Sequence, residues 1–157
     1  MLITVISGAN INQLGQEPIQ INGAINLSQI EHNLRQLSND LNIQLEFFQS
    51  NIEGEIVNKI HECRSKSQGI LINAGSYSQT SVAISEAIRS VMIPCVEVIL
   101  GNVTMNDKIK TLISPACVGL ITGFGPFSYH LGLISLHNII EQLIAQQKQL
   151  QEQQTQQ

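Results

Sequence analysis

The chain has little charge and few of the residues from which metal and redox sites are built. Charged residues make up 13% of its 157 residues, Trp is absent, and there are four His and three Cys. Cys63, Cys95 and Cys117 are widely separated and form no Cys-x-x-Cys pair. We therefore expect reduced thiols in a cytoplasmic protein, with no metal site and no cofactor.

Long apolar runs and an excess of positive charge are also missing. No stretch approaches the roughly 18 consecutive apolar residues that a membrane span needs, and the sequence does not open on a basic segment followed by an apolar one. A net charge of −4 argues against a nucleic-acid-binding surface. We expect neither a membrane nor a nucleic acid as a partner, and an anionic ligand would need local positive groups.

Predicted strands and helices alternate along the chain. Short apolar, β-branched or alternating segments predict strands at 2–7, 43–48, 69–72, 95–100 and 118–122. Apolar residues at helical spacing predict helices that start after Asn26 or Ser28, cover 53–67 and 81–92, and start again at Pro126 or Ser128.

Size and composition predict one domain. A chain that is 43% hydrophobic can bury a single core, which we assign to residues 1–145. The segment 146–157 is mostly Gln, and we expect it to extend the last helix by a turn or two without an assigned role.

Alternating strands and helices predict an α/β fold, in which a five-stranded parallel sheet carries helices on both faces. In such sheets, ligands bind at the carboxyl ends of the strands, where the strand order reverses. Asn10, Asn73 and Ile99–Gly101 all lie at or just after the ends of predicted strands. We therefore expect these residues to meet at one edge of the sheet.

Four segments occur in a characteristic order: Gly8–Pro18 (GANINQLGQEP), Gln49–Glu55 (QSNIEGE), Asn73–Ala83 (NAGSYSQTSVA) and Gly119–Gly125 (GLITGFG). Together they resemble the type II 3-dehydroquinate dehydratases, small lyases of the shikimate and quinate pathways. The resemblance runs from about Leu2 to Ile140. It implies a flavodoxin-like three-layer sandwich, conversion of 3-dehydroquinate to 3-dehydroshikimate, no cofactor, and a homo-oligomer of trimers that assemble into dodecamers.

The resemblance also assigns the positions that carry the family's proton transfers. In the family, a tyrosinate after the first strand is the base, and the Arg of a Gly-x-Arg-Glu-Pro stretch stabilises its charge. Gln16 stands at that Arg and Ile21, or Asn22 with one extra loop residue, at that Tyr. Gln79 stands at the general acid His and Ile99 at a second His. Amide and aliphatic side chains cannot transfer these protons.

Other family contacts are kept. Asn10 and Asn73 match asparagines that face the substrate and the intermediate, and Glu86 matches an acidic residue that reaches a neighbouring subunit's site. From the residues alone, Asn10 and Asn73 fit equally well as turn-forming residues at strand ends. Glu86 is better interpreted as a solvent-exposed helix position.

The resemblance implies further ligand contacts after the fourth predicted strand. Gln79 can bind a hydroxyl group by hydrogen bonding, and the backbone N–H groups at Leu100 and Gly101 can bind a carboxylate. Lys110 stands nearest to two family Arg residues. It offers charge without the two-pronged geometry of a guanidinium.

Only two Tyr are available as replacement bases. Tyr129 is expected in the core under the final helix, whereas Tyr77 lies in the Asn73–Thr80 segment and is the candidate substitute base. The four His of the predicted helices are interpreted as surface or packing residues: His32, His61, His130 and His137. Lys59 and Lys66 are interpreted as part of a solvated helix face.

Three interpretations of function follow. The first is a catalytically degenerate member of the family, retained for ligand binding or oligomeric assembly. The alternative is a functioning 3-dehydroquinate dehydratase with relocated residues, in which Tyr77 is the base and Lys110 binds the carboxylate. The third is a changed enzyme or a small-molecule binder whose ligand is more neutral than 3-dehydroquinate, because the site has lost cationic and polar side chains.

Overall fold

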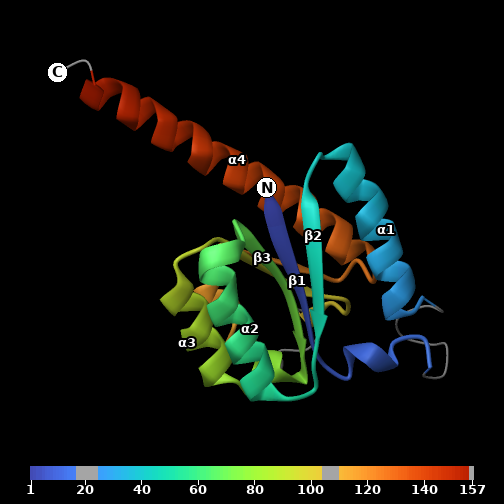
Figure 1. The fold of residues 1–157 in the computed structure, drawn as a ribbon. Coiled ribbons are helices and arrows are strands. Elements are labelled where there is room, and N and C mark those ends of the chain that lie inside the picture. Colours follow the sequence, from blue (N-terminus) through green and yellow to red (C-terminus); the bar gives the residue numbers. More distant parts are fainter. Residues whose placement is uncertain (17–24, 104–109, 156–157) are drawn as a thin grey trace.

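The computed structural model describes residues 1–16, 25–103 and 110–155. Its five strands are β1 (Leu2–Ala9), β2 (Gln44–Gln49), β3 (Gly69–Gly75), β4 (Cys95–Ile99) and β5 (Gly119–Thr122). All pairings are parallel, and the strand order is β2-β1-β3-β4-β5 (Figure 1). The predicted five-stranded parallel sheet is confirmed.

Four helices pack on this sheet: α1 (Leu27–Asp40), α2 (Glu53–Lys66), α3 (Val82–Val91) and α4 (Phe127–Thr155). Short 3-10 turns within the described residues include η1 (Ile11–Gln13), η2 (Ser76–Gln79) and η4 (Ser114–Ala116). Helices α1 and α4 cover one face of the sheet, and α2 and α3 cover the other (Figure 1). This arrangement confirms the three-layer α/β architecture.

Alternation along each strand divides the core between the two faces. Ile3 and Val5 of β1 pack with α1 and α4, whereas Ile6 packs with α2 and α3. In β3, Leu71 faces the first layer and Ile72 the second. Successive side chains of a strand point to opposite faces, so a strand buried on both sides is apolar at nearly every position.

Helix α1 begins with a reciprocal cap. The side chain of Asn26 accepts the backbone N–H of Gln29 at 2.9 Å, and the side chain of Gln29 accepts the backbone N–H of Asn26 at 3.0 Å. Of the two predicted starts, Asn26 is therefore the cap. The exchange satisfies two donors that a helix start otherwise leaves unpaired.

Strands β1 and β3 run further than predicted, because their last residues still pair with each other. Ala9 is opposite Gly75 in the register. A Cβ atom on Gly8 would lie 2.3 Å from the carbonyl oxygen of Ala74, and one on Gly75, whose φ is 62°, would lie 2.1 Å from that of Ala9. Glycine thus permits a close approach of the two strand ends at the switch in strand order.

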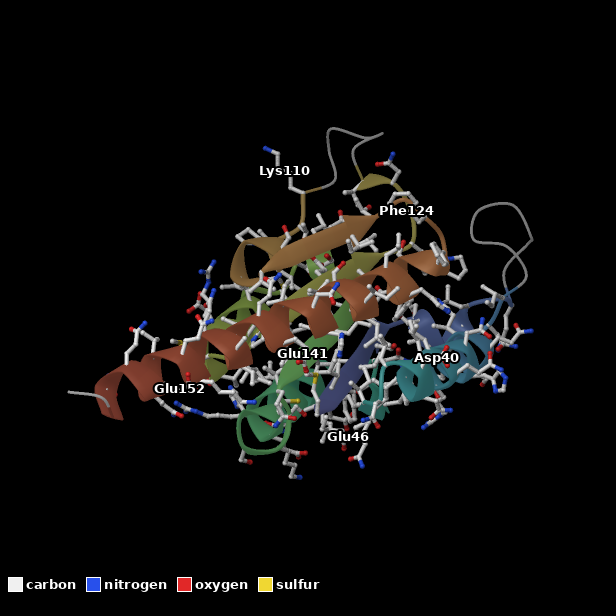
Figure 2. The ribbon with its side chains drawn as sticks, turned by 90° about the horizontal axis from the view of Figure 1, so that it is seen from above. Asp40, Glu46, Lys110, Phe124, Glu141 and Glu152 are labelled. Atoms are coloured by element: carbon white, nitrogen blue, oxygen red, sulfur yellow. The ribbon has the colours of Figure 1, made fainter. Side chains whose placement is uncertain are left out.

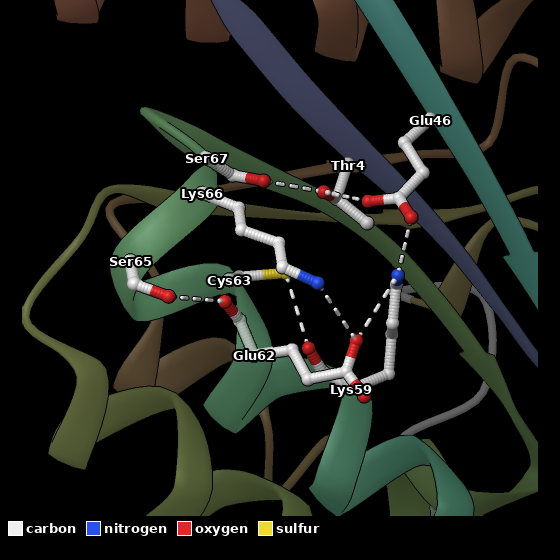
Figure 3. Close-up of polar contacts among 8 residues, drawn as sticks. All are labelled: Thr4, Glu46, Lys59, Glu62, Cys63, Ser65, Lys66 and Ser67. Atoms are coloured by element: carbon white, nitrogen blue, oxygen red, sulfur yellow. Dashed lines mark hydrogen bonds and ion pairs between the residues drawn. The ribbon is translucent and has the colours of Figure 1, made fainter.

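Lys59 differs from its predicted place on a solvated helix face. It is 8% exposed, and its Nζ lies 2.5 Å from Oε1 of Glu46 on β2 (Figure 3). Its hydrocarbon stem crosses the layer between α2 and β2, where Nζ also lies 5.7 Å from the ring centroid of Phe48. The helical pattern of the sequence indicated which residues share a face of α2. It did not indicate that Lys59 would pair with the carboxylate of Glu46 on the neighbouring strand.

Helix α4 continues to Thr155, further into the Gln-rich segment than expected, and its C-terminal half projects beyond the sheet (Figure 1). Within the described residues, no helix combines the length and the apolar character that crossing a membrane requires.

Candidate active site at the carboxyl edge of the sheet

Asn51 joins the segments that follow β1, β2 and β3. Its Oδ1 accepts the backbone N–H of Asn10 at 2.9 Å and the side-chain amide of Gln49 at 3.1 Å. Its carbonyl oxygen accepts the hydroxyl of Tyr77 at 2.7 Å. The sequence analysis gave Asn51 no role. The available signal was its place two residues after the end of β2, within one of the four ordered segments.

Asn10 ends β1 in the left-handed region, with φ 66° and ψ 0°, and precedes η1. Asn adopts this conformation more readily than most residues, because its short side chain tolerates it. The turn-forming interpretation therefore accounts for its backbone. Its side chain is exposed at the carboxyl edge, where a ligand can contact it.

Asn73 combines a structural contact with an unused donor. It is 4% exposed, and its Oδ1 accepts the backbone N–H of Gly75 at 3.2 Å. Its Nδ2 is buried and has no hydrogen-bond partner among the described residues. Buried amides are normally paired, because an unpaired one costs about 1–3 kcal/mol. The same side chain acts to lower the pKa of Tyr129, so its amide also lies close to that hydroxyl.

Tyr129 of α4 lies beneath this position and is fully buried, as predicted for a core residue. Its hydroxyl is 3.4 Å from Oγ of Ser7. Burial raises the pKa of Tyr129 to about 12, although contacts with Ser7 and Asn73 act in the opposite direction. The phenol is therefore neutral at physiological pH and does not supply a base.

Tyr77, the candidate substitute base, is half-buried in η2. Its hydroxyl donates to the carbonyl of Asn51, and a phenolate would lose that bond because it has no proton to donate. To accept a proton from a substrate, the side chain has to leave this carbonyl.

The structure brings two of the four family positions to the same edge. Gln79 is the exposed last residue of η2, and Ile99 is the half-buried last residue of β4. Gln16 is exposed shortly after η1, and its backbone N–H donates to the carbonyl of Gln13 at 3.1 Å. Ile21 lies outside the described residues.

Leu100 and Gly101 continue this edge after β4. The Leu100 side chain is 8% exposed and belongs to the core beneath α1 and α4, so only its backbone can reach a ligand. The carbonyls of both residues accept hydrogen bonds from the end of β5 and the turn after it: Gly125 donates its N–H to Leu100 at 3.0 Å, and Thr122, the last residue of β5, donates its hydroxyl to Gly101 at 2.7 Å.

The two charged candidates lie further out. Lys110 is exposed, and its side chain points away from the body of the molecule, on the same side as Phe124 (Figure 2). Glu86 is exposed on α3, and its carboxylate lies 3.7 Å from the guanidinium of Arg89. Glu86 therefore has the surroundings expected of a solvent-exposed helix position.

Glu97 of β4 is fully buried beneath η2. Ser78 donates its hydroxyl to Oε1 of Glu97, and Thr111 donates its hydroxyl to Oε2 at 2.8 Å. Burial raises the pKa of the Glu97 carboxyl, while the two hydroxyls act to lower it. Nothing in the sequence pattern indicates that Ser78 and Thr111 are its partners.

A pocket of about 200 Å³ lies between α1 and the start of α4. It is lined by Ile25, Ile30, Asn33, Pro126, Phe127 and His130. Burial lowers the pKa of His130, whose Nδ1 is buried without a partner among the described residues. Nowhere among the described residues is a group of three or more His, Cys, Asp or Glu placed to hold a metal ion.

Known proteins are similar to this chain over nearly its whole length. A protein from Nitratiruptor named 3-dehydroquinate dehydratase is 46% identical over 95% of this chain and 99% of its own. A Campylobacter jejuni protein with the same name is 45% identical over 99% of both chains.

These relatives overturn the expectation that the chain is catalytically degenerate, because near-full-length similarity to proteins named as dehydratases favours a functioning enzyme. That expectation compared side chains one position at a time, at Gln16, Ile21, Gln79 and Ile99. A proton-transfer site depends on which groups meet in space, and the segment that ends with Gln79 also carries Tyr77. Changes at aligned positions therefore do not by themselves exclude the reaction.

Solved structures show the same architecture. The type II dehydroquinase of Butyrivibrio crossotus superposes with a TM-score of 0.83 at 35% identity, over 87% of this chain and 97% of that one. The family model described as dehydroquinase class II matches residues 1–137. With this match, the fold and the full-length relatives, the chain belongs to the dehydroquinase class II family.

Proposed function

We propose that this chain catalyses the dehydration of 3-dehydroquinate to 3-dehydroshikimate. The observation that carries the proposal is near-full-length identity of 45–46% to relatives named 3-dehydroquinate dehydratase. The geometry supports it, because Asn10, Asn73 and Gln79 all lie at the carboxyl edge of the sheet.

The buried amide of Asn73 is suited to stabilise the negative charge that develops on the substrate in this elimination. Removal of a proton next to the ring carbonyl gives an enolate, whose oxygen carries negative charge. The Nδ2 atom of Asn73 is a buried donor that makes no hydrogen bond among the described residues, and its side chain lies close enough to Tyr129 to act on the pKa of that phenol. A preorganised donor in a site shielded from water stabilises such an oxyanion more than a solvated donor does.

We assign the proton removal to Tyr77 and substrate anchoring to Lys110. Tyr77 first gives its hydroxyl proton to solvent and leaves the Asn51 carbonyl. The resulting phenolate then accepts the proton that the substrate loses. Lys110 supplies a single positive charge to the substrate carboxylate. Gln79 binds the departing hydroxyl by a hydrogen bond, and solvent water supplies the proton that converts it to water.

We also propose a homo-oligomer built from trimers, as the resemblance implies. Large apolar side chains are exposed around α3, among them Val82 at 63% and Met92 at 85%. Solvent contact with such side chains is removed when copies of the chain associate.

The test is the steady-state dehydration of 3-dehydroquinate, followed by absorbance of the enone product. Wild-type protein should turn over, and Tyr77→Phe should lower kcat by at least about 10²-fold, the usual cost of losing a general base. An active family member serves as the assay control. Absence of turnover from folded, oligomeric wild-type protein would overturn the proposed function; unchanged turnover in Tyr77→Phe would overturn only the assignment of the base.

A further inference from the structure

Glu97 receives hydroxyl donors from two segments that are distant in the sequence. Ser78 belongs to η2, which follows β3, and Thr111 precedes η4, which leads into β5. Glu97 is fully buried and Ser78 is 3% exposed, so little water competes for these bonds. We call Glu97, Ser78 and Thr111 the Glu97 clasp.

Each carboxylate oxygen of Glu97 accepts one hydroxyl proton in the clasp. The hydroxyl oxygen of Thr111 accepts the backbone N–H groups of Ile113 and Ser114, each at 3.1 Å. These occupy both of its lone pairs, which leaves its proton for Oε2 of Glu97. Ser78 also lies 3.0 Å from Thr111 Oγ1, but that oxygen has no lone pair left, so the Ser78 proton goes to Oε1 of Glu97.

A backbone bond reinforces the connection. Leu112 donates its N–H to the carbonyl of Ser78 at 2.7 Å. The segment around Thr111 is therefore attached to η2 through a side-chain network and a main-chain hydrogen bond. Both attachments depend on Ser78, which the carboxylate of Glu97 fixes from below.

The residues next to the clasp are the ones to which the proposed function gives chemical roles. Ser78 lies between Tyr77 and Gln79, and Thr111 directly follows Lys110. We propose that Glu97 is a positioning residue that holds the proposed base on η2 and the anchoring lysine on the next segment in one fixed arrangement. This inference rests on the proposed function, since it concerns the geometry of the same reaction.

The ionised form of Glu97 is the one that fits the clasp. A protonated carboxyl or a Gln amide offers one acceptor instead of two, and Thr111 has no lone pair left for an added donor. The other titratable group on this face of β4 is the buried thiol of Cys95, whose pKa is raised by burial and by the nearby Cys117. That thiol is neutral at physiological pH. Among the described residues of the two attached segments, the titratable groups are Tyr77 and Lys110.

Substitutions at Thr111 test the clasp most cleanly. Thr111→Val keeps the shape and removes the hydroxyl, and Glu97→Gln keeps the shape and removes one acceptor. Both should lower kcat/KM by about 10- to 100-fold, the order of loss expected when reacting groups shift by a fraction of an ångström to an ångström. Thr111→Ser, which restores the hydroxyl, should recover most of the activity.

A matched control lies near the amino ends of the strands, away from the carboxyl edge that carries the clasp. Thr4 is fully buried, its hydroxyl lies 2.5 Å from that of Ser67, and it donates to Glu46 at 3.3 Å (Figure 3). Thr4→Val thus removes a buried hydroxyl with the same kinds of partner. It should lower stability much as Thr111→Val does and leave kcat/KM unchanged.

Hydrogen exchange of the Leu112 amide separates the structural claim from the catalytic one. Exchange should be faster in Thr111→Val and Glu97→Gln than in wild type or Thr4→Val. Unchanged exchange would overturn the clasp itself. Faster exchange with wild-type kcat/KM would overturn the positioning role. Wild-type protein without any turnover would instead overturn the proposed function, and hydrogen exchange would still decide whether Glu97 joins the two segments.

Discussion

At the residue scale, two asparagines with left-handed backbones lie at opposite edges of the sheet. Asn10 has φ 66° and ends β1 at the carboxyl edge, and Asn42 has φ 54° and precedes β2 at the amino edge. Both residues adopt a left-handed turn conformation that most residues with a side chain disfavour. Only Asn10 lies where the proposed substrate binds.

Replacing each of these asparagines by Ala separates turn formation from ligand contact. We expect Asn10→Ala and Asn42→Ala to lower the free energy of unfolding by similar amounts, about 1 kcal/mol, because both force Ala into the left-handed region. Only Asn10→Ala should also lower kcat/KM. Urea unfolding and steady-state kinetics on the two variants check this, and equal kinetic effects would remove Asn10 from the substrate site.

The buried carboxyl of Glu97 makes a second prediction, about pH. Its pKa is raised in the folded protein by burial, so the folded state holds this proton more tightly than the unfolded state. The stabilisation by that proton is complete below the ordinary value of 4.5 and is lost as pH rises through the higher folded value. Urea unfolding at several pH values should show this decrease in wild type.

Glu97→Gln cannot titrate and should lack this contribution. The difference in unfolding free energy between the two proteins should therefore shift in favour of the variant as pH rises above 4.5. A difference that stays constant over that range would mean that Glu97 titrates as it does in the unfolded chain.

At the scale of elements, the ion pair between Glu46 and Lys59 joins β2 to α2. The hydrogen bond from Lys59 lowers the pKa of Glu46. Burial acts to lower the pKa of Lys59, but its contacts with Glu46 outweigh it, and the pKa is raised. The Glu46 side chain is 40% exposed, so solvent screens the attraction, and we expect the pair to contribute no more than about 1 kcal/mol.

Lys59→Met keeps the buried stem and removes the charge. At neutral pH the variant should be less stable than wild type by up to about 1 kcal/mol. Because the folded pKa of Glu46 is lowered, the difference should shrink as pH falls from 4.5 through that lower value. Urea unfolding across acidic pH measures this. An undiminished difference in acid would assign the effect to packing against Phe48 instead.

At the scale of the whole molecule, the oligomeric state of the chain can be tested directly. We predict a homo-oligomer built from trimers, observed by light scattering after size exclusion and by native mass spectrometry. Val82→Asp should weaken it, because a carboxylate in an apolar contact is costly to desolvate. Arg64→Asp, an exposed charge change on α2, is the control. A monomeric wild-type protein at all concentrations would contradict the proposed assembly.

Much of the fold followed from local patterns. Continuous apolar runs indicated strands buried on both faces, and the helix starting near Asn26 was visible from its spacing and its cap. The ends of β1 and β3 were placed too early, because Gly8 and the segment 73–75 have the composition of a loop. Their pairing depends on each other's backbone, which lies more than sixty positions away in sequence.

The candidate site was foreseen only in part. Asn10, Asn73 and Gln79 were placed at the carboxyl edge from strand ends and from the family resemblance. The contacts that join Asn51 to the segments after β1 and β3, and those of Glu97 with Ser78 and Thr111, were not. Polar residues such as these carry no periodic signal, so their partners become known only when the loops are placed in space.

The sequence by itself determined the alternation of strands and helices, the layers and the family, because hydrophobic periodicity and ordered motifs act over short stretches of chain. Tertiary structure alone decided that Lys59 is buried beside Glu46, that the side-chain amide of Asn73 is buried at the carboxyl edge of the sheet, and that one buried carboxylate contacts two segments of the site. These features arise from groups that meet across the sheet. Their energies depend on burial and geometry, which the order of residues does not state.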